Sequence, residues 1–356
     1  MTSSAGADER RLTTLLGIEH PVVQGPLGGG LSSVALAAAV SNAGGLGSFG
    51  AHHLAPDAIT ALVTDLRAAT AKPFAVNLWV PQPTEGRPAD LAPHRERLVP
   101  FYRRLGLGDP PGDDQLRFPS FPDQVEALLD AAPPIISFVM GIPPREVLDT
   151  AKEKNILTIG TATTVDEAEA LEAAGLDVVV ASGSDAGGHR GAFLRPVEHS
   201  LVGTFSLVPQ VVDRTTIPVV AAGGIADRRG VRAALALGAH GVQVGTGFLA
   251  TRESNAGAVH KRMLHTDAAR VTVLTKVFSG RTARGIHNAL IAELGNAEVA
   301  PYPFQNALMQ PLRTAAAERG LADYVSLWAG QAAPLTNTEN AGTKSAADYF
   351  AELVQP

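Results

Sequence analysis

Short apolar runs alternate with longer amphipathic stretches along most of the chain. Several apolar runs are continuous, as expected for strands that are covered on both faces. This alternation is typical of βαβ units and predicts a closed parallel (β/α)8 TIM barrel over residues 1–250. The predicted strands are Pro21–Gly25, Gly45–Phe49, Phe74–Leu78, Ile135–Val139, Ile156–Gly160, Asp177–Ala181, Ile217–Ala222 and Gly241–Gly245.

Capping residues mark two of the intervening helices. Thr164 precedes an acidic first turn and Gly175 ends the same run. A threonine hydroxyl caps a helix start well, and glycine suits the left-handed position after a helix end. Asp227 precedes a second amphipathic run in the same way. We therefore predict helices after both caps.

Two segments do not follow the repeat. Residues 81–122 are rich in proline, glycine and charge, which predicts a long loop over one end of the barrel. Residues 251–356 form a mixed, mainly helical extension. We expect this extension to pack on the barrel and to cover the mouth of the active site.

Composition and charge narrow the functional classes. The 356 residues are 45% hydrophobic and 18% charged, which suits a globular protein with a large core. A net charge of −6 gives no basic field for nucleic acid. The chain has no cysteine, which excludes thiolate catalysis and cysteine-ligated zinc and fits the cytoplasm. The N-terminus has no apolar signal segment, and the uncharged stretch 21–56 is too rich in small residues for a membrane span.

The sharpest local signal lies within residues 218–250, where two consecutive predicted strands each end in glycine. Gly223 and Gly224 follow the first strand, whereas Gly245 and Thr246 follow the second. Glycine lets the backbone approach a bulky anion, and a short helix starting near Thr246 would direct N–H groups at a phosphate. The ends of the seventh and eighth strands are the recurrent phosphate site of such barrels, although plain tight turns would use the same glycines.

A second glycine pattern, GLGSFG at residues 45–50, matches the dinucleotide fingerprint GxGxxG. That fingerprint needs a strand before it and a helix that opens within it. Here a helix-like run precedes the glycines, which lie within and just after a predicted strand. A Rossmann fold is therefore disfavoured.

Candidate chemistry follows the sixth predicted strand. The loop carries Asp185, Gly187, Gly188 and His189 at the carboxyl end of a strand, where barrel active sites lie. His189 could accept a proton, or donate as a cation to an anionic substrate, near neutral pH. A surface histidine in a flexible loop is the alternative. Asn77 ends the third strand and is expected at the mouth.

Two other arrangements are weak. Ser182 or Ser184 could form a triad with His189, but the loop has no GxSxG elbow. His52 and His53 suggest a metal site, yet neighbouring strand residues point to opposite faces. No metal is expected.

Across nearly its whole length, the chain resembles the nitronate monooxygenase family, formerly called 2-nitropropane dioxygenases. The matching segments are LGIEHPVVQGPLGGGLSSVALAAAVSNAGGLGSFGA, NLWVPQP, FVMGIPP, GTATTVDEAEALEAAGLDVVVASGSDAGGHRG, the two glycine-ended strands, FSGRTARGIHN and PYPFQNAL. The resemblance implies an FMN-dependent barrel without metal. Such an enzyme oxidises alkyl nitronates or propionate 3-nitronate with O2, through a flavin semiquinone, to a carbonyl compound and nitrite.

The resemblance also assigns roles to residues. His189 matches the active-site histidine of the family, and Tyr302 is expected to close the substrate pocket. The residues expected at FMN are Gly25, Pro26, Leu27, Asn77, Ser182, Gly187, Gly188, Gly223, Gly224, Gln243, Val244, Gly245 and Thr246.

Departures from the family pattern leave the substrate open. Ser182 stands where many members have glutamine, Leu27 replaces methionine in the first motif, and Met140 belongs to an unusual MGIPP sequence. Two alternatives remain: an FMN-dependent enoyl-thioester reductase that uses NAD(P)H, and a flavin-free barrel that binds a phosphate ligand. Monomer and homodimer are both open.

Overall fold

A parallel eight-stranded barrel forms the body of the protein in the computed structural model, which describes residues 10–82, 86, 88–295, 297–336 and 343–355. The strand order is β1-β9-β8-β6-β5-β4-β3-β2. A parallel bridge between Val23 and Leu46 joins β1 to the start of β2, so the barrel closes. The strands are β1 (Val22–Gln24), β2 (Gly47–Gly50), β3 (Phe74–Trp79), β4 (Ile135–Val139), β5 (Leu157–Ala162), β6 (Val178–Ser182), β8 (Val219–Ala222) and β9 (Gly241–Val244). The TIM barrel and all eight of its predicted strands are confirmed.

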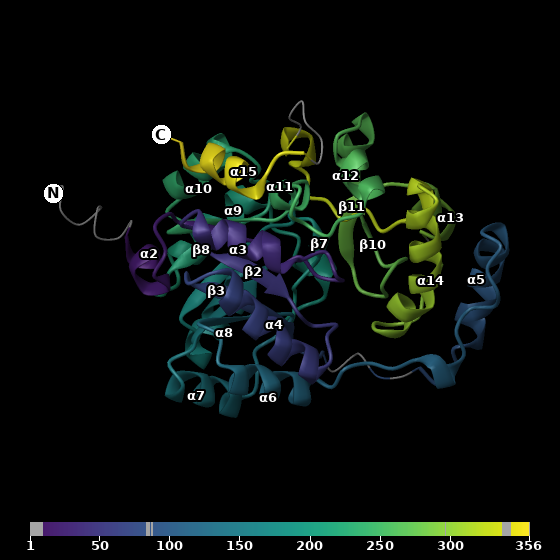
Figure 1. Cartoon of the computed structure of the whole chain (residues 1–356), viewed down its shortest axis with the longest axis horizontal. Helices are drawn as coiled ribbons and strands as arrows, with labels where there is room; N and C mark the ends of the chain where they lie inside the picture. The colour runs from purple at the N-terminus through teal and green to yellow at the C-terminus, as the bar shows by residue number, and fades with distance from the viewer. Residues whose placement is uncertain (1–9, 83–85, 87, 296, 337–342, 356) are drawn as a thin grey trace.

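Helices cover the outside of this barrel (Figure 1). They are α3 (Val34–Asn42), α4 (Pro56–Ala69), α6 (Phe121–Ala131), α7 (Arg145–Glu153), α8 (Val165–Ala174), α9 (Thr204–Val212) and α10 (Arg228–Ala236). A further helix, α2 (Arg11–Leu16), precedes β1 and packs against the barrel interior instead. Both predicted caps are confirmed. The Thr164 side chain accepts a hydrogen bond from Glu167 N, and the Asp227 side chain accepts from Arg229 N and Gly230 N.

Alternating strand residues divide the core into two layers. Val178 and Val180 of β6 pack in one cluster with Leu12 and Leu16 of α2, whereas Val179 packs in another cluster with residues from the covering helices. Side chains of successive strand residues point to opposite faces. The first cluster therefore fills the barrel interior, where α2 contributes to it, and the second attaches the helices.

The insertion differs from its prediction as a loop. It contains the helix α5 (Ala92–Arg104) and the short 3-10 helix η1 (Asp113–Gln115). The apolar face of α5 packs against α14 (Phe304–Glu318) of the extension, and Tyr102 Oη donates to Leu308 O at 2.6 Å. Figure 1 shows α5 beyond α14, on the side away from the barrel. The sequence did not predict this helix because it contains two prolines, Pro93 and Pro100. Pro93 lies in the first helical turn, where proline is well tolerated.

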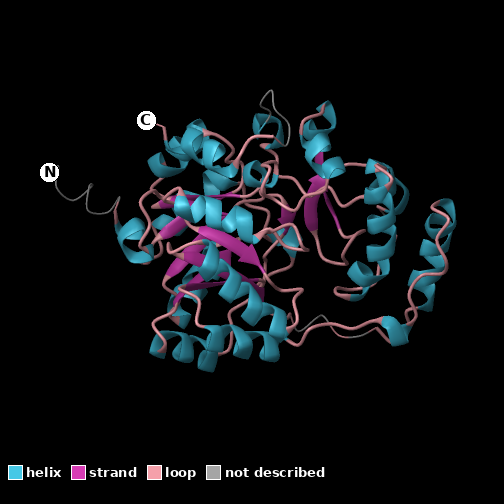
Figure 2. Cartoon of the chain, viewed as in Figure 1, coloured by secondary structure: helices cyan, strands magenta, loops and turns pink. Residues whose placement is uncertain are grey.

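The C-terminal extension contains a small antiparallel sheet as well as helices (Figure 2). Its order is β10-β11-β7, in which β7 (Gly188–His189) comes from the loop after β6. The short helix α11 (Thr246–Leu249) precedes the extension. Besides α14, the other elements of the extension are α12 (Ala258–Leu264), η3 (Asp267–Arg270), β10 (Thr272–Thr275), β11 (Ala283–Ile286), α13 (Ala289–Leu294), η4 (Ala322–Tyr324), η5 (Ala333–Thr336) and α15 (Ala346–Val354). Among the described residues, no helix is long and apolar enough to cross a membrane.

Candidate active site

The carboxyl ends of the parallel strands bring the predicted site residues to one mouth of the barrel. Leu27 follows β1, Asn77 lies in the second half of β3, and Ser182 ends β6. Gly224 follows β8, and Gly245 follows β9. All strands in a closed parallel barrel point the same way, so residues distant in sequence meet at this end.

Open space borders two of the glycines predicted at the phosphate. A Cβ added to Gly245 would meet no heavy atom within 4 Å, and one added to Gly224 would meet only Asp185, at 3.5 Å. Gly224 has a φ of +71°, which a branched residue adopts poorly. The helix α11 begins at Thr246, as predicted, and its first N–H groups have no partners within the helix. The backbone at this corner of the mouth is therefore not covered by protein atoms at Gly245.

The loop after β6 is tied down by its own charged residues. Asp185 Oδ2 accepts from Thr204 N at 2.7 Å, at the start of α9. The buried Arg190 donates from Nη1 to Gly183 O and from Nη2 to Ser182 O, at 2.6 and 2.8 Å. Asp185 and Arg190 thus fix the loop, and the alternative of a flexible surface loop is wrong.

A second segment, residues 327–331, packs across this loop and is called the strap here. Ile286 N donates to Leu327 O at 2.8 Å, and Gln331 N donates to Asp185 O at 2.9 Å. A Cβ on Gly187 would lie 2.4 Å from Gly330 N. Gly187 is therefore required by close contact with the strap, a reason that the sequence did not reveal.

His189 is held in the short strand β7. Its Nε2 lies 2.8 Å from Ser279 Oγ, and that hydroxyl is also 3.1 Å from Arg281 O. A carbonyl oxygen can only accept, so the Ser279 hydroxyl donates its proton to Arg281 O. The same hydroxyl oxygen then accepts from His189, which places the ring proton on Nε2 and leaves a lone pair on Nδ1. Ser279 is the serine that contacts His189, so the geometry does not support a triad through Ser182 or Ser184.

The environment of His189 keeps its ring neutral. Burial, followed by the positive charges of Arg281 and Arg313, lowers the pKa of His189 from its usual 6.5 to about 3. At neutral pH the imidazole can accept a proton through Nδ1. Of the two roles predicted for His189, the lowered pKa favours the proton acceptor, and Arg281 and Arg313 are the positive charges that contribute to this shift.

Aromatic side chains surround this imidazole. The ring centroids of Trp79 and Trp328 lie 4.8 and 5.3 Å from that of His189. Tyr302 lies 5.4 Å from Trp79, and Arg281 Cζ lies 4.6 Å from the centre of the Tyr302 ring. Tyr302 thus belongs to the same cluster as His189.

His52, one of the two adjacent histidines, belongs to the same cluster. Its ring stacks on Trp79 with a centroid distance of 3.7 Å, and burial lowers its pKa well below the usual 6.5. Within the described ranges, no group of three or more His, Cys, Asp or Glu residues could hold a metal ion. His52 thus lies beside Trp79, which also contacts the His189 ring.

Some predicted cofactor residues have side chains that are already engaged. Val244 is fully buried in the outer core, so only its backbone could meet a ligand. Asn77 Nδ2 donates to Ser137 O and Oγ at 3.1 and 3.0 Å. Leu27 is half-buried and packs against two core clusters. The remaining predicted positions, all beside strand ends, are Gly25, Pro26, Gly188, Gly223, Gln243 and Thr246.

Several residues of this cluster were missed at the sequence level. Trp79 follows Asn77 by two positions, and Ser279 and Arg281 lie in the segment FSGRTARG. Arg313 and the strap come from a region that was predicted only as an extension. A tryptophan at a strand end was a usable signal, but the strap had no local pattern that indicated its partners.

Several known proteins are similar to this chain in sequence and in fold. The family model described as nitronate monooxygenase matches residues 9–355. Probable nitronate monooxygenases of Staphylococcus saprophyticus and Staphylococcus aureus strain N315 are 42% and 41% identical, and the matches cover 90% and 94% of this chain and 91% and 95% of theirs. A nitroalkane oxidase from Streptomyces ansochromogenes superposes with a TM-score of 0.88 at 38% identity, over 96% of both chains. FabK from Thermotoga maritima reaches 0.73 at 31% identity, over 97% of this chain and 94% of that one.

Proposed function

Because the chain belongs to the nitronate monooxygenase family, we propose that it oxidises alkyl nitronates or propionate 3-nitronate with O2, using FMN held at the barrel mouth. The products are a carbonyl compound and nitrite. The observation that carries the proposal is the neutral imidazole of His189, which Ser279 holds in place and which has positively charged arginines nearby. It lies at the same end of the barrel as Gly245, beside which the protein leaves open space.

The residues at the mouth fit FMN. Open space beside Gly224 and Gly245 leaves room for the phosphate, and the first N–H groups of α11 are available to bind it. The polar groups of Asn77, Ser182 and Gln243 lie at the ends of their strands, where the rest of the cofactor would bind. When bound, FMN supplies the one-electron chemistry that no side chain here can perform.

The protein side chains bind and orient the nitronate. A nitronate carries its negative charge on two oxygens, and Arg281 brings a positive charge to the rings of Tyr302 and Trp79. His189 Nδ1 can accept a hydrogen bond or a proton, because Ser279 holds the opposite ring nitrogen. The surrounding indole and phenol rings exclude water and strengthen these polar contacts.

Purification followed by two assays tests the proposal. The protein should be yellow and should consume oxygen and release nitrite with a nitronate as the sole added substrate. NADH oxidation on an enoyl thioester without nitronate turnover would favour the reductase instead. A colourless protein that does not bind added FMN would favour a flavin-free barrel.

Replacement of His189 tests the site itself. His189→Ala should keep the flavin spectrum and lower kcat/KM for nitronates by about 100-fold or more, as is usual when an acid-base group is removed. Ser279→Ala should lower it less, because the ring remains. An unchanged rate in His189→Ala would remove this histidine from the reaction.

Location and assembly are also part of the proposal. We place the enzyme in the cytoplasm, which fits a chain without cysteine. Size-exclusion chromatography with light scattering would decide between monomer and homodimer.

A further inference from the structure

Trp79 is placed at the barrel mouth by the alternation of β3. Ala75 of this strand packs in the interior core cluster, whereas Val76 and Leu78 pack in a cluster with residues of the covering helices. Successive strand residues point to opposite faces, so Asn77 and Trp79 share the inward face of Ala75. Trp79 is the last residue of β3. Its indole therefore projects inward at the end of the barrel where the candidate active site lies.

His52 holds this indole in place. The two rings stack with a centroid distance of 3.7 Å and an interplanar angle of 8°. The backbone of His52 is itself fixed, because the buried Gln124 of α6 donates from Nε2 to His52 O at 2.9 Å. A Cβ on Gly28 would lie 2.8 Å from His52 Cε1 and 3.5 Å from Trp79 Cζ2. The two rings and the loop after β1 thus pack as one unit, which leaves Trp79 little freedom to move aside.

His52 enters this stack as a neutral ring. Its Nδ1 is buried and has no hydrogen-bond partner among the described residues. Burial lowers the pKa of His52 well below its usual 6.5, so the ring carries no charge at neutral pH. A flat neutral ring packs well on an indole. His53, the other histidine of the pair, is exposed and meets only the edge of the His52 ring. The two neighbouring histidines therefore differ in their relation to Trp79.

Trp79 also borders the groups that are proposed to bind the nitronate. Its ring centroid lies 4.8 Å from that of His189 and 5.4 Å from that of Tyr302. Arg281 Cζ lies 5.4 Å from the centre of the same indole. The side chains of Trp79, His189 and Tyr302 are each only partly buried, so a ligand can reach them. An anion bound between Arg281 and His189 would therefore contact the indole.

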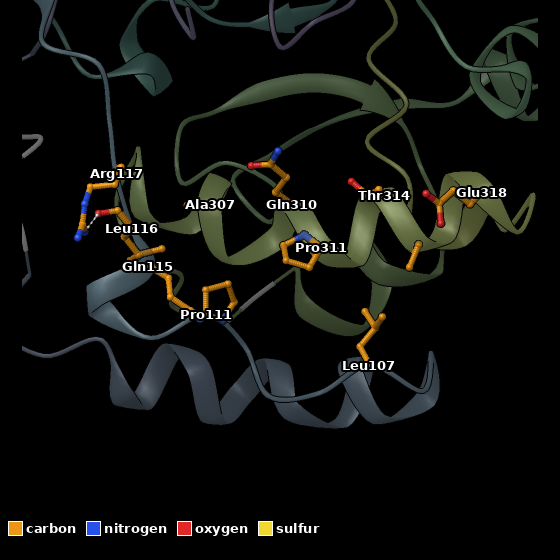
Figure 3. A pocket seen from close by; sticks show the side chains of 11 residues that line it. Leu107, Pro111, Gln115, Leu116, Arg117, Ala307, Gln310, Pro311, Thr314 and Glu318 are labelled. Atoms are coloured by element: carbon orange, nitrogen blue, oxygen red, sulfur yellow. Dashed lines mark hydrogen bonds between the residues drawn. The ribbon is translucent and has the colours of Figure 1, made fainter. Parts of the chain in front are cut away.

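The groove shown in Figure 3 is separate from these rings. Gln310 and Pro311 of α14 line it together with Pro111 and Leu116 of the insertion, and its volume is about 560 Å³. None of the residues that line this groove belongs to the cluster of rings around His189. The size of a ligand that binds at His189 is therefore set by the rings rather than by this groove.

A fixed indole beside the anion restricts what fits next to His189. We propose that Trp79, held by His52, is the specificity residue that limits the length of the carbon chain of the nitronate. Short nitronates bind beside the indole, whereas a longer chain would have to displace it. This inference rests on the proposed function and extends it to the choice among nitronates.

Two nitronates of different length test this limit. The wild type should oxidise ethyl nitronate with a higher kcat/KM than hexyl nitronate. Trp79→Ala should raise the ratio of kcat/KM for hexyl to that for ethyl nitronate by about 10-fold or more, chiefly through KM for hexyl nitronate, because the methylene groups of the longer chain gain room and apolar contacts. A loss of rate common to both substrates cancels in this ratio. An unchanged or lower ratio would overturn the proposal.

Further variants separate the stack from general effects. His52→Ala removes the ring that holds the indole, so the ratio should rise by a smaller factor of about threefold, and His52→Phe, which can still stack, should restore the wild-type ratio. His53→Ala is the matched control, because His53 is the exposed neighbour of His52, and it should leave the ratio unchanged. An equal rise in His53→Ala would overturn the role of the stack. If Trp79→Ala did not fold, Trp79→Phe would replace it, and an unchanged ratio there would also overturn the proposal.

A binding measurement separates this inference from the reaction. Propionate and heptanoate match ethyl and hexyl nitronate in length, carry a planar carboxylate in place of the nitronate, and are not oxidised by this chemistry. Isothermal titration calorimetry should show that Trp79→Ala gains about 10-fold or more in affinity for heptanoate relative to propionate. Nitronate oxidation without this gain would refute only the role of Trp79. A gain in heptanoate affinity without nitronate oxidation would refute only the proposed reaction.

Discussion

Gly187 and Gly245 lie at the same end of the barrel, in glycine-rich segments that look alike in the sequence, yet their surroundings differ. A Cβ on Gly187 would lie 2.4 Å from Gly330 N and 2.5 Å from Ala329 C, whereas a Cβ on Gly245 would meet no atom within 4 Å. Gly187 is small because the strap crosses it. Gly245 borders space that the protein leaves open. The comparison teaches that glycine at position 187 is required by packing within the protein, whereas packing does not require it at position 245, where the proposed function places the phosphate.

The largest effect is expected at the open corner. Gly245→Val should keep the fold, because φ at this position is −102° and no protein atom is in the way. It should weaken FMN binding by about 100-fold, since the branched side chain would occupy the space of a charged phosphate. Flavin titration of the apoprotein measures the affinity, and urea unfolding checks the fold. Full flavin loading in this variant would show that the open corner is not the phosphate site.

The opposite result is expected at the closed position. Gly187→Ala forces the strap backbone away, and overpacking of this kind costs up to about 3 kcal/mol. Urea unfolding at a fixed flavin concentration measures the loss. Gly257→Ala is the control, because an added Cβ there meets nothing within 4 Å and its φ is −63°. A stable Gly187→Ala protein that has lost only its flavin would mean that both glycines serve the ligand.

His260 contacts the strap at Trp328, and this contact should make the unfolding free energy depend on pH. His260 Nε2 lies 2.9 Å from Trp328 O, and burial lowers the pKa of His260 from 6.5 to about 4. The folded protein keeps this ring neutral, whereas the unfolded chain takes up a proton below pH 6.5. The stabilisation from the neutral ring is therefore complete above that pH and is lost as the pH falls toward the folded pKa.

A non-titrating variant isolates this contribution. His260→Gln keeps an amide donor for Trp328 O but cannot titrate. Between pH 7 and pH 5 the wild type should lose about 2 kcal/mol more unfolding free energy than His260→Gln. His189 titrates in both proteins, so its own contribution cancels. Parallel loss in the two proteins would show that His260 is not held neutral in the fold.

The sequence predicted the parts of the site that depend on local order. Each strand end, the caps Thr164 and Asp227, and the start of α11 follow from residues within a few positions of one another. The positions of the strap and of Arg313 do not follow from local sequence. Gly187 and Gly330 are distant in the sequence and come together only in the fold, and the same is true of His189 and Ser279. Helix α5 was missed for a related reason, since its apolar face is stabilised by α14, about 200 residues away. Tertiary contacts of this kind leave no periodic signal.

Thr246 links the open corner to the strap, and the smallest effect is expected there. It begins α11 beside Gly245, but its Oγ1 accepts from Gly330 N at 3.0 Å. Thr246→Val keeps the shape and removes the acceptor, so the Gly330 N–H would lose its partner at a cost of about 1 kcal/mol. Urea unfolding should show this loss, and Thr246→Ser should restore stability. FMN affinity should fall by less than about threefold, because the backbone N–H of residue 246 is retained. If instead Thr246→Val lost its flavin without losing stability, the hydroxyl would serve the cofactor, and the strap would depend on Asp185, β11 and His260 alone.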